Sequence, residues 1–399
     1  MTEQTAELEE FRRTVRRWLT TEAPAKSGPD DFSSAHVERA DSFEEHVRDA
    51  AATIKLVTAW QRRLDDAGWG ALGWPEEYGG RGEPFRKVFA EEQARVGVTT
   101  KPLSVGVEMV GPTLIAFGTE EQKRRHLAPI RSGDEIWCQL FSEPDAGSDL
   151  PSLRTSAVAV SDGWRLNGQK VWTSGASSSH FGLALARTDP STTRHAGISA
   201  FIVNMADPGV DVRPLRQMSG AYHFNEVFLS DVFVPRTGLI GEPGGGWSVA
   251  TTMLGSERAS LGGGTSSGSP EELIELAHKA GRSNDPRVRN ELATLYCRAS
   301  VLQWSIQRAQ GGESRLGALL KLQYSEHARR MTTAALDLLG SSGVAWATGL
   351  DDETTTVWQD RFLFAPGLRI AGGTDEIQRN TIAERILGLP KEPRSSAPG

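Results

Sequence analysis

The sequence is poor in cysteine and contains no long apolar run. Its two cysteines among 399 residues, Cys138 and Cys297, are far apart and cannot form a disulfide framework, so we expect each to be a small core residue. No stretch approaches the roughly 20 consecutive apolar residues that cross a bilayer. Residues 1–10 are acidic and polar, unlike a secretion signal. These absences predict a cytoplasmic protein without a membrane span.

The chain also lacks clustered metal ligands and an excess of positive charge. Its eight histidines and two cysteines show no HxxxH, HxH or CxxC spacing, which argues against a metal site built from protein ligands. The net charge of -7 gives no electrostatic reason to expect nucleic acid as a partner. With 38% hydrophobic and 24% charged residues, the composition is that of a globular protein, and the length predicts two or three domains.

The period of the hydrophobic pattern divides the chain into three parts. Towards both ends, apolar residues recur at spacings of three and four, as on one face of a helix. The middle third alternates instead, around a hairpin turn at Asp162-Gly163. The predicted helices cover 8–19, 54–64, 286–306, 316–339 and 377–389, and the predicted strands cover 157–160, 164–171, 198–203 and 225–234. Loops are predicted at 23–34 and 262–269.

One C-terminal helix is marked with particular clarity. Asp285 can cap it and Pro286 suits its first position. Its apolar seam consists of Val288, Leu292, Leu295, Ala299, Leu302 and Ile306. A seam of this kind is typical of a helical bundle. We therefore expect an N-terminal helical domain at 1–135, a middle β domain at 136–246 and a C-terminal helical bundle at 247–399.

Six short motifs occur in order along the chain. The most informative is Gln-Leu-Phe-Ser-Glu-Pro-Asp-Ala-Gly-Ser-Asp at 139–149, which offers close backbone approach, amide donors and a hydroxyl to an anionic or heterocyclic ligand, although a tight capped turn has the same composition. The others are GWPEEYGG at 73–80, GTEEQK at 118–123, GQKVW at 168–172, DVFVP at 231–235 and GTDEIQRN at 373–380. Together they resemble the landmarks of the acyl-CoA dehydrogenase family, from about residue 60 to residue 390.

The resemblance implies a fold and a cofactor. The family fold is mainly α with a central β domain, and comprises an N-terminal helical domain, a middle β-barrel or sandwich domain and a C-terminal four-helix bundle. FAD lies between the β domain and the bundle. The residues implied at the cofactor are Phe141, Ser142, Gly147, Ser148, Trp172, Ser174, Gly340, Ser341, Thr374 and Glu376. For Trp172, a plain core position is the alternative.

Two family elements of the cofactor site are altered here. A neighbouring subunit completes the site in the family through a Gln-x-x-Gly-Gly-x-Gly turn, which appears as Asp-Leu-Leu-Gly-Ser-Ser-Gly at 337–343. The departures at Asp337 and Ser341 keep the glycine geometry but weaken the side-chain assignment. An Arg-x-x-Phe-Gly element is missing, and Arg282 and Arg287 lie in its region as either cofactor residues or solvated cations.

The family reaction needs a carboxylate that removes the α-proton of an acyl-CoA while the β-hydrogen leaves as hydride to the flavin. Many members carry this glutamate in a Tyr-Glu-Gly-Thr motif, which reads Ala-Gly-Gly-Thr at 371–374, so Gly372 offers only its main-chain N–H to the thioester oxygen. Another branch places the base on an earlier bundle helix, in a Glu-Arg pair. Glu257, followed by Arg258, is therefore the candidate base, and a surface ion pair is its alternative reading.

The resemblance also implies partners. The substrate would contact Ser148, Arg258, Gly372 and Gly373, and an electron-transfer flavoprotein would accept the electrons. Family membership implies lipid or fatty acid metabolism and a homotetramer built as a dimer of dimers, with a heteromer as the alternative. If Glu257 points away from the pocket, three roles stay open: a cofactor-binding but inactive subunit of a heteromeric dehydrogenase, a flavin monooxygenase, or a structural paralogue. The acyl group is not defined.

Overall fold

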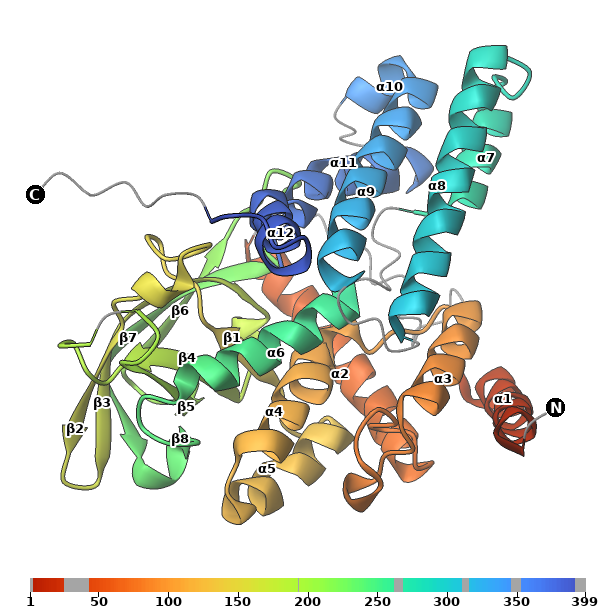
Figure 1. Cartoon of the computed structure of the whole chain (residues 1–399). Helices are drawn as coiled ribbons and strands as arrows, with labels where there is room; N and C mark the ends of the chain where they lie inside the picture. Colours follow the sequence, from red (N-terminus) through yellow and green to blue (C-terminus); the bar gives the residue numbers. More distant parts are fainter. Residues whose placement is uncertain are drawn as a thin grey trace, which may run out of the picture. The chain divides into compact units, whose positions relative to one another are not determined.

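The computed structural model describes residues 3–24, 43–192, 194–261, 268–310, 316–345 and 353–391 (Figure 1). The chain forms two compact units, residues 1–256 and 257–399. The predicted loop at 23–34 lies outside the described residues beyond position 24, and the loop at 262–269 lies outside them before position 268.

Helices form the first half of the N-terminal unit. They are α1 (Glu3–Glu22), α2 (Phe43–Asp66), α3 (Glu83–Val96), α4 (Gly111–Phe117) and α5 (Glu120–Ser132), with a π-helical turn at Val105–Val110 before α4. The predicted helices at 8–19 and 54–64 are confirmed within α1 and α2. Their apolar faces meet in a core that includes Val15, Trp60, Leu64 and Phe89.

Two of the sequence motifs hold this helical part together. Gly80 lies so close to the chain before it that a Cβ would fall 1.7 Å from the carbonyl oxygen of Trp74, and only glycine fits there. Thr119 and Gln122 form a reciprocal cap at the start of α5, with hydrogen bonds of 3.2 and 2.9 Å. The Gln122 amide also donates to the carbonyls of Thr237 and Leu239, both at 2.7 Å, and so fastens α5 to the end of the β region.

The β region is one eight-stranded sheet with the order β6-β7-β3-β2-β4-β5-β8, and β1 pairs with β4. The strands are β1 (Trp137–Leu140), β2 (Ser156–Val160), β3 (Gly163–Ser174), β4 (Phe181–Arg187), β5 (Ile198–Asn204), β6 (Val210–Leu215), β7 (Phe224–Pro235) and β8 (Leu239–Ile240). All four predicted strands are confirmed. The strand β4 escaped prediction because residues 182–186 are buried without alternation and consist of Gly, Leu and Ala, whereas the equally buried β5 contains β-branched residues that favour strands.

The C-terminal unit is helical. After α6 (Gly246–Leu261) follow α7 (Pro270–Lys279), α8 (Pro286–Gln310), α9 (Gly317–Leu339), α10 (Ser341–Val344), α11 (Glu353–Leu368) and α12 (Asp375–Thr381), with a π-helical turn at Ile382–Ile386. The predicted seam of α8 is confirmed: Leu295 packs beside Met331 and Trp358, and Leu302 beside Tyr324. The fold is thus mainly α with a central β domain, as predicted.

The two cysteines differ in their environment. Cys138 is fully buried in the sheet, as predicted, and burial raises the pKa of its thiol to about 12. The prediction for Cys297 is wrong, because this residue is exposed. It lies two positions after the seam residue Leu295, about 200° around the helix, and so faces away from the core. Within the described ranges, no helix is long and apolar enough to span a membrane, and no group of three or more His, Cys, Asp or Glu is placed to hold a metal.

Candidate cofactor and substrate site

The loop that follows β1 carries the first group of predicted site residues. A pair of hydrogen bonds between the backbones of Glu143 and Ala146, both 3.1 Å, closes a tight turn. Gly147 and Ser148 come directly after this turn and form the exposed tip of the longer loop between β1 and β2, and a Cβ on Gly147 would meet no atom within 4 Å. The side chain of Phe141 is buried, so it can offer a ligand only its main chain. The tip is therefore an open surface of backbone and hydroxyl groups.

Trp172 in β3 is the most unusual aromatic residue of this region. Its φ of 60° is rare for a residue with a side chain, and the residue is 62% exposed. The ring touches Phe224 edge to face, with centroids 5.9 Å apart. The register of β3 against β7 shifts between Lys170 and Thr173, which accommodates the turned residue. Trp172 is therefore not a core aromatic, and together with exposed Ser174 it presents a flat apolar face beside a hydroxyl.

A buried ion pair joins these two segments, and sequence reasoning assigned it no role. Lys170 is 0% exposed, and its Nζ lies 2.8 Å from Glu143 Oε1 and 3.1 Å from the carbonyl oxygen of Phe141. Burial lowers the pKa of Lys170 to about 8, although Glu143 opposes the shift. Burial alone would raise the pKa of Glu143, but Lys170, Thr155 and the backbone N–H of Arg154 hold it below its ordinary value. Both residues belong to motifs that the sequence reveals, but the sequence does not show that their side chains are in contact.

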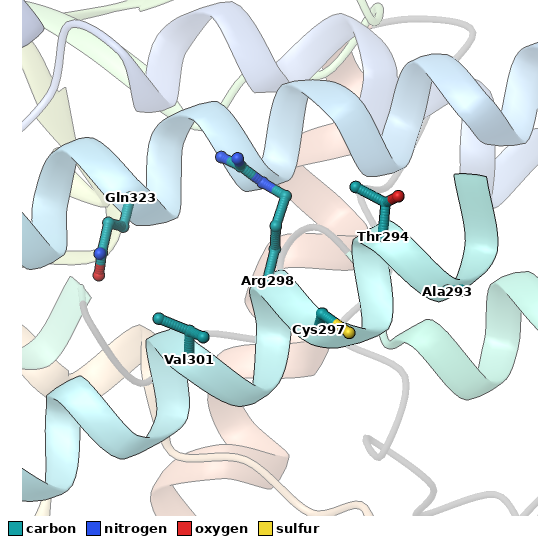
Figure 2. A pocket seen from close by; sticks show the side chains of 6 residues that line it. All are labelled: Ala293, Thr294, Cys297, Arg298, Val301 and Gln323. Atoms are coloured by element: carbon teal, nitrogen blue, oxygen red, sulfur yellow. The ribbon is translucent and has the colours of Figure 1, made fainter. Parts of the chain in front are cut away.

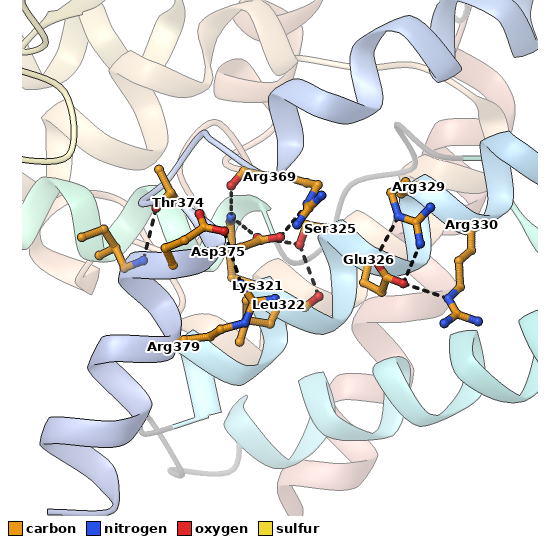
Figure 3. A network of polar contacts seen from close by, with 12 residues as sticks. Lys321, Leu322, Ser325, Glu326, Arg329, Arg330, Arg369, Thr374, Asp375 and Arg379 are labelled. Atoms are coloured by element: carbon orange, nitrogen blue, oxygen red, sulfur yellow. Dashed lines mark hydrogen bonds and ion pairs between the residues drawn. The ribbon is translucent and has the colours of Figure 1, made fainter. Parts of the chain in front are cut away.

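The turn at 371–374 carries a second group, in the C-terminal unit (Figure 3). Gly372 and Gly373 have φ values of 63° and 86°, which a residue with a side chain rarely adopts. The buried amide of Gln378 donates to both of their carbonyls, at 3.0 and 3.3 Å. The hydroxyl of Thr374 accepts from the N–H of Ile377 and caps α12. The turn is therefore rigid, and exposed Glu376 follows it.

Asp375 anchors this turn to α9 (Figure 3). Its carboxylate accepts from Lys321 at 2.7 Å, from Ser325 at 2.8 Å and from Arg369 at 2.9 Å. Lys321 also donates to the carbonyl of Arg369 at 2.9 Å. Burial would raise the pKa of Asp375, but the neighbouring cations and the hydroxyl lower it. Sequence reasoning missed this cluster as well.

The turn at 337–343 forms a third group. Gly340, with a φ of 60°, ends α9 and is exposed, as is Ser341. The side-chain amide of buried Gln359 donates to three carbonyls in the turn and just after it, those of Ser342, Gly343 and Ala345, at 2.8–3.2 Å. Arg282, three residues after the end of α7, donates to the carbonyl of Asp337 at 2.9 Å. Arg282 and this turn, 55 residues apart, are thus brought together.

Two predicted residues fall where the structure describes only the backbone. Glu257 and Arg258 belong to α6, and their side chains lie outside the described residues. The assignment of the base therefore stays a prediction. The remaining predicted residues form one group at 141–174 in the N-terminal unit and two turns in the C-terminal unit.

A cavity of about 460 Å³ lies between α8 and α9, and its lining includes none of the predicted site residues (Figure 2). It is lined by Ala293, Thr294, Cys297, Arg298, Val301 and Gln323. Arg298 Nε and Gln323 Oε1 are buried without a hydrogen-bond partner in the described part of the chain, and so is Nδ1 of nearby His327. Burial and the charge of Arg298 lower the pKa of His327 to about 4, so this imidazole is neutral at pH 7.

Comparison with known proteins gives a consistent family. Sequence profiles of the N-terminal, middle and C-terminal domains of acyl-CoA dehydrogenases match residues 5–134, 138–232 and 244–387. Acyl-CoA dehydrogenase IpdE1 of Mycobacterium tuberculosis is 39% identical over 97% of this chain and 99% of its own length.

Two solved assemblies have the same fold. The Tcur3481-Tcur3483 steroid ACAD is 29% identical, with a TM-score of 0.80 over 97% of this chain and 98% of that one. A chain of the ChsE4-ChsE5 complex from Mycobacterium tuberculosis is 28% identical, with a TM-score of 0.78 over 98% of this chain and 99% of that one.

Proposed function

The chain belongs to the acyl-CoA dehydrogenase family, and we propose that it oxidises an acyl-CoA with FAD to the α,β-unsaturated product. The observation that supports FAD as the cofactor is the exposed ring of Trp172. This residue is held at positive φ beside Ser174, and its strand is hydrogen-bonded to the 141–148 loop. Strained backbone around an exposed aromatic is typical of a ligand site. The domain division at 1–135, 136–246 and 247–399 is part of the same proposal.

The described residues fit FAD. The face of Trp172 and the hydroxyl of Ser174 suit the flavin ring, and the open tip at Gly147 and Ser148 suits phosphate. The second unit would add Thr374 and Glu376, and the turn at Gly340 and Ser341 would serve the cofactor of a neighbouring subunit. When bound, FAD supplies the acceptor for the β-hydrogen, which leaves as hydride.

The remaining chemistry belongs to the chain itself. The Glu257 carboxylate takes the α-proton, so that the electrons of that C–H bond form the new double bond as the β-hydrogen departs. The N–H of Gly372 donates to the thioester oxygen, on which negative charge develops. Arg258 is a cation on the substrate side, and Ser148 and Gly373 complete the contacts with the acyl-CoA.

Replacement of the base tests this proposal. Glu257→Gln should keep the yellow, FAD-loaded protein and slow anaerobic flavin bleaching by an acyl-CoA at least 100-fold, because general-base catalysis is worth about that much. Glu291→Gln, at an exposed position on α8, is the matched control and should bleach at the wild-type rate. Bleaching of Glu257→Gln at the wild-type rate would reject the assignment of the base.

A second candidate function is that of a cofactor-binding, non-catalytic subunit. Gly372 leaves the commoner base position empty, and a structural relative is a complex of two proteins, ChsE4 and ChsE5. This candidate predicts a yellow protein that no acyl-CoA bleaches, whether residue 257 is Glu or Gln. Anaerobic titration of the wild-type protein separates the two candidates.

The proposal also covers the class of acyl group that the protein oxidises and the protein that accepts its electrons. Likeness to a steroid ACAD favours a bulky, steroid-derived acyl-CoA over a straight chain. Flavin bleaching with linear, branched and ring-bearing acyl-CoAs of equal carbon number tests this preference. We propose an electron-transfer flavoprotein as the acceptor, and stopped-flow transfer of electrons from the reduced enzyme to such a protein would measure it.

A further inference from the structure

The ion pair between Lys170 and Glu143 has no part in the proton and hydride transfers, yet it lies between the two segments proposed to hold the flavin. Lys170 is 0% exposed and the residue Glu143 is 7% exposed, so neither side chain is available to the cofactor. Removing two charges from water costs several kcal/mol per ion, and well-packed apolar residues often stabilise a protein equally well. Stability alone therefore does not account for the burial of this pair.

Glu143 closes the loop onto itself. Its two carboxylate oxygens accept from the backbone N–H groups of Arg154, at 2.6 Å, and Thr155, at 2.9 Å, where the loop ends before β2. The backbone of Glu143 forms the turn with Ala146. One carboxylate therefore ties the first residues of the loop to its last residues, and the exposed tip at Gly147 lies between the two ends.

Lys170 fastens this closed loop to β3. Its Nζ donates to Glu143 and to the carbonyl of Phe141, and the N–H of the next residue, Val171, donates to the carbonyl of Ser142 at 2.9 Å. Two consecutive carbonyls of the loop are thus held by two consecutive residues of the strand. A slip of one residue would break both contacts, so the register of the loop against β3 is fixed.

The residue that follows this attachment is Trp172, with its rare positive φ. A conformation of this kind is strained and persists only where the surrounding structure determines it. Before Trp172, the strand is held by Lys170 and Val171. After it, the carbonyl of Thr173 accepts from the side-chain amide of Asn225 at 3.1 Å. The exposed ring is therefore held from both sides.

We propose that Lys170 and Glu143 are positioning residues for the flavin, which set the distance between the loop tip at Gly147 and Ser148 and the face formed by Trp172 and Ser174. This inference rests on the proposed flavin site. A pair with this role affects cofactor affinity and the surroundings of the flavin ring, whereas a pair that only stabilises the fold affects neither.

The double variant Lys170→Met/Glu143→Gln tests this role without leaving a buried charge. Met has nearly the length of Lys, and Gln keeps an oxygen for a backbone N–H, so the apoprotein should unfold close to the wild-type temperature. We expect its Kd for FAD to rise at least tenfold and the visible absorption band of bound FAD to shift. The single variant Lys170→Met should lose more affinity, since it also leaves Glu143 unpaired.

Glu92→Gln is the control for stability alone. The Glu92 side chain is buried in the same unit and accepts from Arg12 at 2.9 Å and from Arg16 at 2.8 Å, far along the chain from the loop. This variant should lower the unfolding temperature of the apoprotein and leave the Kd for FAD unchanged.

The outcomes are distinguishable. Wild-type affinity and an unshifted band in the double variant would overturn the positioning role, while leaving the flavin site intact. An equal loss of affinity in Glu92→Gln would also overturn it, because the effect would then follow stability alone. A wild-type protein that binds no FAD would overturn the proposed function together with this inference.

Discussion

Two lysines in the described part of the chain are buried against carboxylates, one in each compact unit, and the surroundings of the two pairs differ. Lys170 meets Glu143 at 2.8 Å and Lys321 meets Asp375 at 2.7 Å, and each lysine also donates to a main-chain carbonyl. Each pair fastens a segment of the proposed site to a distant element. In both units, therefore, a charged side chain is buried where a loop must be held in one position.

The difference lies in what else surrounds each carboxylate. Among the described residues, Glu143 has one cation, Lys170, and otherwise accepts from backbone N–H groups. Asp375 has a second cation, half-exposed Arg369, and the hydroxyl of Ser325. The pair in the β region is therefore neutral and has no spare cation, whereas the cluster in the helical unit keeps one positive partner when the other is removed. Loss of a lysine should consequently cost more in the first unit than in the second.

The largest effect is expected for Lys170→Met. This change leaves the Glu143 carboxylate buried without a cation, which costs about 3–5 kcal/mol. At pH 7, amide hydrogens in peptides covering 141–174 should exchange faster, by the factor that corresponds to this loss of free energy. Peptides of the C-terminal unit should keep their wild-type exchange rates. Equal protection of 141–174 in the variant and the wild type would contradict the account of this pair.

Lys321→Met, the matched change in the second unit, should cost less, about 2–3 kcal/mol, since what is lost is a hydrogen bond between charged groups. Asp375 would keep Arg369 and Ser325. The rate of amide hydrogen exchange in peptides covering 365–380 measures this loss of stability. The sharper test is Arg369→Met in the Lys321→Met background, which should cost more than Arg369→Met alone, because only then is Asp375 left without a cation. Additive effects would remove the distinction between the two pairs.

Such pairs mark the limit of what the sequence predicts. The seam of α8 and the strands β2, β3 and β7 follow from hydrophobic periodicity, because one face of each meets a core. Strand β5 is buried at all of residues 198–203, and it was recognised from its apolar, β-branched composition instead. Cys297 was misplaced because the burial of a lone cysteine was judged from residue type rather than from its place on the helix. The motifs around Gly147 and Trp172 marked the candidate site by resemblance.

The ion pairs could not be predicted in the same way. A lysine in a helix or strand is expected to be exposed. The partners of Lys170 and Lys321 lie 27 and 54 residues away, so that only the folded chain brings them together. The glutamines that hold the turns, Gln359 and Gln378, are equally unmarked, since the amide of a glutamine gives no local signal of the carbonyls it will meet.

His327 extends the comparison to a buried group whose neutral form is the one that the folded protein favours. Its pKa of about 4 lies below the ordinary 6.5, so the unfolded chain binds the extra proton in that interval and stability is lost as the pH falls from 6.5 to 4. The loss should be on the order of 2 kcal/mol. Urea unfolding at pH 7, 5.5 and 4.5 measures it, and His327→Leu should flatten this part of the profile. An unchanged slope in the variant would show that other groups govern acid sensitivity in this range.

The smallest expected effect is the loss of a helix N-cap, and it distinguishes an N-cap in the proposed site from an ordinary N-cap in the same unit. Thr374 accepts from the N–H of Ile377 and Ser269 accepts from the N–H of Glu272, both at 3.2 Å. Replacing either with Ala removes one N-cap, so each variant should lose about 1 kcal/mol of stability. Only Thr374→Ala should also weaken the binding of FAD, because Ser269 caps α7 and is not one of the predicted cofactor residues. Equal FAD affinity in the two variants, measured by fluorescence titration of the apoproteins, would remove Thr374 from the cofactor site and leave the turn it caps with a purely structural role.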